Sequence, residues 1–293
     1  MDCLGYRLSQ FAPPLLASTA MGRDGQLAQL QFPQAVRTTV HIDSRDRDFD
    51  VFPNSSEFVV ELPETLKNIS SAVLVSAELP LSYYVFTAAR GNTSLTVTHN
   101  AVTHTVTIPD GNYTAATMAT ALQSALNTAF SGNFTVAISP TTMKCTISHN
   151  GTLAVDTTAA TKKTEWGLGY YLGFARGVVT SGTDSVTGTY VSTMNPENYL
   201  LLDIEELNGI GQSAMYAAGG SGRRSFAKVP LNGDSYQYNY YDKTLTYVDV
   251  RPQLTKLDKL RVSIRFHDGT VVNLNGGEWS MSLEFACTLT RGL

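Results

Sequence analysis

The sequence is poor in cysteine and in charge, and it lacks any long apolar run. Its three cysteines, Cys3, Cys145 and Cys287, are widely spaced and odd in number. The last two alternate in phase with apolar neighbours, so we expect small hydrophobic residues in a reducing compartment and no disulfides. No apolar stretch approaches the roughly 20 residues of a membrane-spanning helix. Two prolines interrupt the segment 11–21, which only faintly resembles a signal-peptide core, so neither membrane insertion nor secretion is predicted.

The charge balance argues against nucleic acid as the main partner. The chain has 21 Lys and Arg against 25 Asp and Glu, a net charge of −4, whereas phosphate binding needs clustered cations. Catalytic signatures are also missing, since the sequence has no P-loop, no G-x-S-x-G turn, no H-E-x-x-H helix and no C-x-x-C pair. The glycines of 167–173 do not lead from a strand into a long helix, as a dinucleotide site requires. The sequence therefore predicts neither an enzyme nor a bound cofactor.

The chain is rich in segments where apolar and polar residues alternate, which is the period of a half-buried strand. This pattern predicts strands over 57–62 and 72–79 near the start of the chain, and over 260–266 and 279–289 near its end. Many short strands, few helices and long connections are typical of a mainly β protein. We therefore predict a jelly-roll β-sandwich in which the early and late strands share sheets.

A smaller unit interrupts this β pattern. Residues 91–176 read as strand, strand, helix, strand, strand and helix, and the spacing of apolar residues predicts the first helix over 113–130. A link rich in Gly, Ser and Thr follows at 177–193. Residues 1–35 lack a sustained period and predict an extended N-terminal arm, which either docks on a neighbour or frays. The jelly-roll domain is then 36–293, with the α+β unit as an insertion.

The polar corner over 44–56 and a pair of histidines are candidate metal sites. Four carboxylates lie in or beside the corner: Asp43, Asp46, Asp48 and Asp50. They resemble a calcium loop, but the segment lacks the glycine and terminal Glu of an EF-hand. Arg45 and Arg47 interleave with them, which favours a solvated turn held by local ion pairs. His99 and His104 flank a predicted hairpin turn and could face each other, but without a third ligand they make a weak site. No metal is predicted.

Three segments are candidate protein-contact surfaces. Their residues are Arg45, Arg47 and Asp48 in the corner, Arg223 and Arg224 in a glycine-rich loop, and Tyr236, Tyr238 and Tyr240 in an alternating tyrosine run. The two loop arginines could grip an acidic patch or a phosphate, or could belong to an ordinary solvated loop. Tyrosine is enriched at protein contacts because it adds area at little entropic cost. A tyrosine-lined sheet core explains the run almost as well, so both interpretations stay open.

Several landmarks, in order along the chain, resemble one known group of proteins. They are FPNSSEFVVELP (52–63), LVSAELPLSYYVF (74–86), IPDGNYT (108–114), LGF (172–174) and LRVSIRFHDGTVVNLNGGEWSMSLEF (260–285). Together they resemble jelly-roll minor capsid and related virion proteins of large icosahedral double-stranded DNA viruses, of the chlorovirus and giant-virus type. The resemblance covers roughly residues 38–290. The N-terminal arm and the glycine-rich loop at 219–225 match nothing in this group.

The resemblance implies a structural, non-enzymatic protein of the capsid shell, which ties the major capsomers together and needs no cofactor. Its partners would be the major capsid protein and other minor capsid proteins, with a homo-oligomer allowed. Direct contact with nucleic acid or membrane is not expected, and the protein would be made in the host cell without a secretory signal. Two alternatives are a penton protein of the same capsid and a carbohydrate-binding β-sandwich such as a fibre head. Fold does not determine function, so the capsid role depends on the resemblance.

Overall fold

The structure is a computed structural model. It describes residues 35–159, 167–195, 197–208, 215–216, 222–223, 225–232, 237–241 and 246–288. The predicted N-terminal arm lies outside these residues, apart from Ala35. Among the described residues, no helix is both long enough and apolar enough to cross a membrane.

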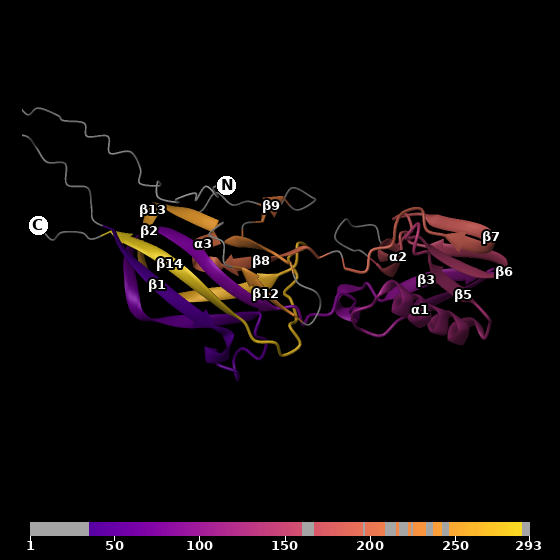
Figure 1. Ribbon diagram of the computed structural model, residues 1–293, viewed down its shortest axis with the longest axis horizontal. Coiled ribbons are helices and arrows are strands. Elements are labelled where there is room, and N and C mark those ends of the chain that lie inside the picture. Colours follow the sequence, from indigo (N-terminus) through magenta and orange to yellow (C-terminus); the bar gives the residue numbers. More distant parts are fainter. Residues whose placement is uncertain are drawn as a thin grey trace, which may run out of the picture. The chain divides into compact units, whose positions relative to one another are not determined.

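Two antiparallel sheets contain most of the strands (Figure 1). The larger sheet has the strands β1 (Ala35–Asp43), β14 (Ser280–Thr288), β2 (Glu57–Pro80), β13 (Thr246–Arg265), β8 (Tyr199–Ile204) and β11 (Ala227–Pro230), in that order, and β12 (Tyr238–Tyr241), which pairs with β2. The smaller sheet has β4 (Val102–Thr107), β3 (Ser94–His99), β6 (Cys145–Asp156) and β5 (Thr135–Ile138), in that order, and β7 (Val179–Thr187), which pairs with β6.

The remaining elements are short, except for one helix. They are the hairpin of β9 (Met215–Tyr216) and β10 (Gly222–Arg223), the 3₁₀ helices η1 (Ser44–Asp46) and η2 (Ala88–Arg90), and the helices α1 (Ala115–Phe130), α2 (Leu168–Tyr171) and α3 (Glu205–Asn208). Strands far outnumber helices, and the long strands curl. The fold is mainly β and of the jelly-roll kind, which confirms the predicted class.

The predicted strands 57–62 and 72–79 are parts of one long strand, β2. Pro63 follows the first of the predicted strands, and proline cannot donate a ladder hydrogen bond. In the structure, Pro63 lies where the β2–β13 register is irregular, between the pairs Glu61–Lys259 and Leu66–Leu257, so no ladder bond is lost. Asn68 has a positive φ of 54°, close to a second irregularity of the ladders between Ile69 and Ser71. The strand therefore bends instead of ending.

Early and late strands share one core, as predicted. In the ladders of β2, Phe58 lies opposite Val262 of β13, and Leu74 lies opposite Leu283 of β14. All four side chains are fully buried. Each such side chain contributes roughly 1.5–3 kcal/mol by its removal from water. This pairing joins segments about two hundred residues apart and confirms the predicted partnership of the early and late alternating segments.

The smaller sheet packs against α1. Thr114 caps the helix, since its Oγ1 accepts a hydrogen bond from the Thr117 backbone N–H at 3.2 Å, while Thr117 Oγ1 accepts one from Thr114 N–H at 2.9 Å. The buried face of the helix consists of Met118, Leu122 and Leu126. The helix lies within the predicted range 113–130 and begins two residues later, after its cap.

The expected link at 177–193 is wrong, because β7 occupies most of it. Along β7 only Val186 is buried, so the hydrophobic pattern that marks other strands is missing. Backbone pairing with β6, from Thr187–Thr146 to Val179–Asp156, holds the strand instead. The smaller sheet thus continues past residue 176. The limits of the insertion as a domain remain a prediction.

A buried ion pair lies beside the chain segment that connects β2 to β3. Arg90 Nη2 lies 2.7 Å from Glu197 Oε1, and both side chains are buried. His267 Nδ1 lies 3.7 Å from the other oxygen of Glu197. The Arg90 guanidinium stacks 4.0 Å from the centroid of the Phe266 ring, which meets Tyr83 edge to face. One carboxylate therefore joins an arginine and a histidine from distant parts of the chain.

The environment shifts the pKa values of both titratable partners. Burial opposes ionisation of Glu197, but hydrogen bonds from His267 and Arg90 outweigh it and hold the pKa of Glu197 below its ordinary value. The hydrogen bond to Glu197 raises the pKa of His267, against a smaller opposing effect of burial. A raised folded-state pKa means that His267 adds stability below its unfolded pKa of about 6.5, and that this stability is lost as the pH rises through the folded value.

We expect His267→Gln to destabilise the protein more in mild acid than in alkali. At about pH 5.5 the wild-type His267 is charged and faces an ionised Glu197, whereas at about pH 9 it is neutral and contributes less. Denaturant unfolding of both proteins at the two pH values measures the difference. In a Glu197→Gln background the same replacement should show no such pH dependence. An equal loss at both pH values would contradict the charge pairing.

Candidate contact surface

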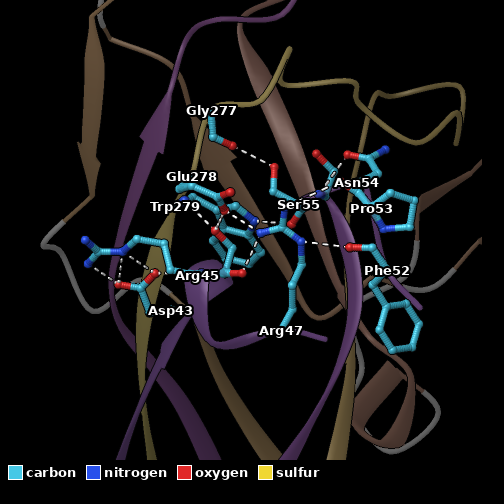
Figure 2. Close-up of polar contacts among 12 residues, drawn as sticks. Asp43, Arg45, Arg47, Phe52, Pro53, Asn54, Ser55, Gly277, Glu278 and Trp279 are labelled. Atoms are coloured by element: carbon cyan, nitrogen blue, oxygen red, sulfur yellow. Dashed lines mark hydrogen bonds and ion pairs between the residues drawn. The ribbon is translucent and has the colours of Figure 1, made fainter. Parts of the chain in front are cut away.

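The polar corner between β1 and β2 begins with an aspartate that caps η1. Asp43 Oδ1 accepts hydrogen bonds from the backbone N–H and from Nε of Arg45, both at 2.9 Å, and Arg45 Nη2 lies 2.5 Å from Asp43 Oδ2 (Figure 2). The side-chain hydrogen bond from Arg45 is the main reason that the pKa of Asp43 lies below its ordinary value. The Arg45 side chain is 72% exposed, so it remains accessible to a partner.

The neighbouring arginine lies inside the corner. The Arg47 side chain is only 4% exposed. Its Nε donates to Phe52 O at 2.8 Å, and its Nη1 donates to Ser44 O and to Glu278 Oε2, both at 2.6 Å (Figure 2). A buried guanidinium is tolerated only when it is paired and hydrogen-bonded in this way. Arg47 therefore stabilises the loop and is not available at the surface, which corrects its predicted place in a contact patch.

The carboxylate that pairs with Arg47 belongs to the segment before β14. Ser44 Oγ also donates to Glu278, and Ser44 and Trp279 exchange two hydrogen bonds of 2.8 Å. The Trp279 indole N–H donates to Ser55 O at 2.7 Å, and Ser55 Oγ donates to Gly277 O at 2.6 Å. We call Ser44, Arg47, Ser55, Glu278 and Trp279 the corner network. It fastens the two ends of the corner to a segment more than 220 residues later.

Two of the four candidate carboxylates, Asp43 and Asp48, have other partners. Asp43 pairs with Arg45, and Asp48 Oδ1 accepts from the backbone N–H groups of Asp50 and Val51, which closes a turn. Within the described ranges, no group of three or more His, Cys, Asp or Glu side chains is arranged to hold a metal.

The two histidines of the hairpin do not face each other. The turn at Asn100 and Ala101 sets the register, in which His99 lies opposite Val102, and His104 lies opposite Val97. The His99 ring instead lies 4.3 Å from the ring of His149, centroid to centroid.

The outer face of the larger sheet brings four strands together beside the corner. In the ladders, Asp43 of β1 lies opposite Ser280 of β14, Ser280 lies opposite Glu78 of β2, and Glu78 lies opposite Tyr240 of β12. Ser280 Oγ donates to Glu78 Oε2 at 2.8 Å. The next row inward consists of Ile42, Met281 and Ala77, which are buried. One row of polar side chains therefore crosses the sheet on its solvent side.

A pocket of about 240 Å³ opens along this row. Its lining residues are Asp43, Arg45, Glu78, Tyr238, Glu278, Trp279 and Ser280, which we call the outer pocket. Three carboxylates and one exposed guanidinium line it, so its charge is negative. The buried Arg47 guanidinium compensates the charge of the Glu278 carboxylate. The outer pocket could accept a basic or hydrogen-bond-donating group from another molecule.

Two exposed tyrosines stand beside the outer pocket. Tyr238 and Tyr240 are 51% and 71% exposed, and their rings stack with centroids 6.2 Å apart. Between them, Asn239 points inward, where its side chain accepts from Asn232 N at 2.8 Å and donates to Pro230 O at 3.0 Å. The alternation expected from the sequence is present over 238–240. It places the two rings on the outer face and not in a sheet core.

The structure thus brings two of the three candidate contact segments together. Arg45 of the corner and Tyr238 of β12 line the same pocket, although they are far apart in the sequence. Asp48 lies on the corner with its carboxylate engaged in the turn. The side chains of Arg223, Arg224 and Tyr236 lie outside the described residues. The contact role of Arg45, Asp48, Tyr238 and Tyr240 remains a prediction.

Sequence reasoning missed several residues of this surface. Glu78 and Glu278 line the outer pocket, and Phe49 and Val51 are large apolar side chains exposed at the corner. Glu78 was detectable, because its position in the alternating pattern sends it to the polar face of β2. No local sequence pattern indicated Glu278, whose role depends on its ion pair with Arg47.

Comparison with known proteins gives a family. A sequence model of a family of unknown function, DUF5901, matches residues 31–238. The chain belongs to this family. The match includes the corner, β2 and the first residue of β12. No curated protein matches the sequence of this DUF5901 protein.

Two solved structures resemble this DUF5901 protein weakly. The mavirus penton protein has 13% identity and a TM-score of 0.41, over 86% of this chain and 99% of the other. A chain in the 3.5 Å structure of the Sputnik virophage has 11% identity and a TM-score of 0.43, over 87% and 98%. Overlaps of this quality do not establish a shared function.

Replacing Arg47 should destabilise the protein strongly. Arg47→Met keeps the length of the side chain but takes the guanidinium away from Glu278 and from two backbone carbonyls, at a cost of about 3 kcal/mol, although Ser44 Oγ still donates to Glu278. Arg45→Met is the matched control, and we expect a much smaller loss because Arg45 is largely exposed. Chemical denaturation of the three proteins measures both effects. Equal losses for the two variants would show that the corner network does not hold the corner.

Proposed function

We propose that this protein is a structural component of a large icosahedral virus particle. As a minor capsid protein it binds the major capsid protein and other minor capsid proteins, and ties capsomers together without catalysis. It acts within the capsid shell, and its specificity lies in its surfaces. Direct binding of nucleic acid is not part of this role.

The observation that carries the proposal is where the resembling landmarks lie in the fold. The landmarks 52–63 and 260–285 belong to strands that pair directly, with Val60 opposite Leu260 and Phe58 opposite Val262. The landmark 74–86 pairs with the end of the last one, through Leu74 and Leu283. Three of the five landmarks, which are scattered along the chain, thus form one continuous framework. Such a pattern supports a likeness of whole domains to jelly-roll virion proteins, and not a chance likeness of short segments.

The outer face supports a role in protein contact. Exposed tyrosines are frequent at protein interfaces, because the ring adds contact area with few rotatable bonds. Tyr238 and Tyr240 form a stacked pair, and the outer pocket, which Tyr238 helps to line, also contains carboxylates and one arginine. An aromatic anchor next to a charged pocket is the arrangement in which a few residues supply most of the binding energy. We therefore place the capsomer-binding surface here.

We expect Tyr238→Ser combined with Tyr240→Ser to weaken binding to the major capsid protein by about tenfold or more. Both rings are exposed, so the fold should survive. Biolayer interferometry with the purified major capsid protein of the same virus measures the affinity. Tyr190→Ser is the matched control, because Tyr190 is also exposed but lies outside the larger sheet. Failure of the unaltered protein to bind major capsid protein, and its absence from purified particles, would refute the proposed role.

The penton alternative makes a different prediction about position. A penton protein occupies the fivefold vertices, whereas a connecting minor capsid protein lies between or beneath capsomers. A map of the intact particle at side-chain resolution separates the two.

The fibre-head alternative draws on Tyr238 beside the outer pocket, since aromatic rings and carboxylates can hold a sugar. In that case a glycan array should show binding that the double tyrosine variant loses. The calcium-assisted form of this alternative fits less well, because Asp43 is engaged by Arg45.

A further inference from the structure

Strand β1 forms one edge of the larger sheet. It pairs along its whole length with β14, in nine consecutive register positions from Ala35–Thr288 to Asp43–Ser280 without a bulge. Among the described residues, no other strand pairs with β1. Within the described part of the chain, its second side presents a row of backbone N–H and C=O groups, which is a template for another strand.

The sequence of β1 has few of the features that protect an edge. Edge strands are commonly blocked by proline, lysine, a bulge or shortness. The segment AVRTTVHID contains no proline and no lysine, spans nine residues and has five β-branched side chains. Val36 is a large apolar residue that is nonetheless 45% exposed near the start of the strand. These properties favour addition of a further strand.

We propose that β1 pairs antiparallel with β1 of a second copy of this chain, so that the larger sheet continues across a twofold axis. Arg37, Thr39, His41 and Asp43 alternate onto the outer face, and Thr38, Val40 and Ile42 onto the inner face. In an antiparallel pair, two facing residues lie on the same side of the sheet. The outer residues of β1 have odd numbers and the inner ones even numbers, so the numbers of two facing residues must have an even sum. Centring the axis on Val40 satisfies this condition and pairs the two strands from Arg37 to Asp43.

This register places unlike charges opposite each other. Arg37 lies opposite the partner's Asp43, and by symmetry Asp43 lies opposite the partner's Arg37. Opposite charges at facing positions stabilise antiparallel strands, and like charges destabilise them. The Arg37 side chain is 72% exposed and pairs with Glu284 of β14 on one side. Its guanidinium has five N–H donors, which allows it to bridge Glu284 and a second carboxylate.

The inner face is also self-complementary in this register. Val40 lies opposite the partner's Val40, and Ile42 opposite the partner's Thr38. The apolar layer under β1 would therefore continue across the axis through Val40 and Ile42, with Thr38 at each end. Two strands pairing about a twofold axis form a closed interface, so the assembly stops at two copies. The contact is small, and the dimer is expected to be concentration-dependent.

The proposal is independent of the capsid role and is tested with the purified full chain. Sedimentation velocity over about 1–200 µM should show a monomer–dimer equilibrium for the unaltered protein. Arg37→Glu and Asp43→Lys should each weaken dimerisation by about tenfold or more, because each places like charges opposite each other twice in the dimer. An equimolar mixture of the two variants should form a heterodimer as tight as the original, since both charge pairs are then unlike.

Two controls make the result decisive. Arg261→Glu makes the same charge change on β13, inside the sheet, and should leave the dimer unaffected. Near-ultraviolet circular dichroism checks the packing of Trp279 in Asp43→Lys, because Asp43 caps η1 next to the corner network. If that variant does not fold, Arg37→Glu against Arg261→Glu decides the question by itself. A monomer at all concentrations, or a dimer that Arg37→Glu leaves intact, overturns the proposal.

Discussion

The structure depends on the pairing of β2 with late strands on both of its sides. This 24-residue strand has β14 along one edge and β13 and β12 along the other. Its buried residues join segments from both ends of the chain in one core. The polar row of the outer face follows from this arrangement, because Ser280, Glu78 and Tyr240 meet through the ladders of β2, and Asp43 joins the row through the β1–β14 ladder. The bends near Pro63 and Asn68 let β2 continue along the curled sheet as one strand.

The corner network shows how a charged loop can be made rigid without forming a functional site. Arg47 is surrounded by a carboxylate and backbone carbonyls, so the guanidinium replaces the hydrogen bonds that these groups would make with water. Because Arg47 is buried, it cannot contact a partner, but its hydrogen bonds fix the positions of the neighbouring residues. Arg45 and the exposed Phe49 and Val51 are thereby presented on a well-defined support. A rigid support lowers the entropic cost of binding a partner.

Much of the framework could be predicted from alternation, and much of the surface could not. The alternating runs at 57–62 and 260–266 were enough to predict strands with one buried face, and the jelly-roll class then predicted that early and late strands share a sandwich. The same reasoning failed for β7, where backbone pairing with β6 replaces a hydrophobic pattern. It also failed for Arg47, because local spacing does not distinguish an arginine that faces water from one that faces a distant carboxylate. Glu278 has no local signal and gains its role only from that contact.

The sequence by itself determined which residues of each strand face the core, because side chains alternate by a fixed period along any extended strand. It also determined where the helix α1 lies, through its cap and its apolar spacing. Only the tertiary structure decided which polar residues meet. Glu78 and Ser280 are 202 residues apart, and their hydrogen bond depends on a register that two irregularities in the β2–β14 ladder help to set. A shift of one residue would have sent those side chains to the opposite face, so no local pattern could have predicted the outer pocket.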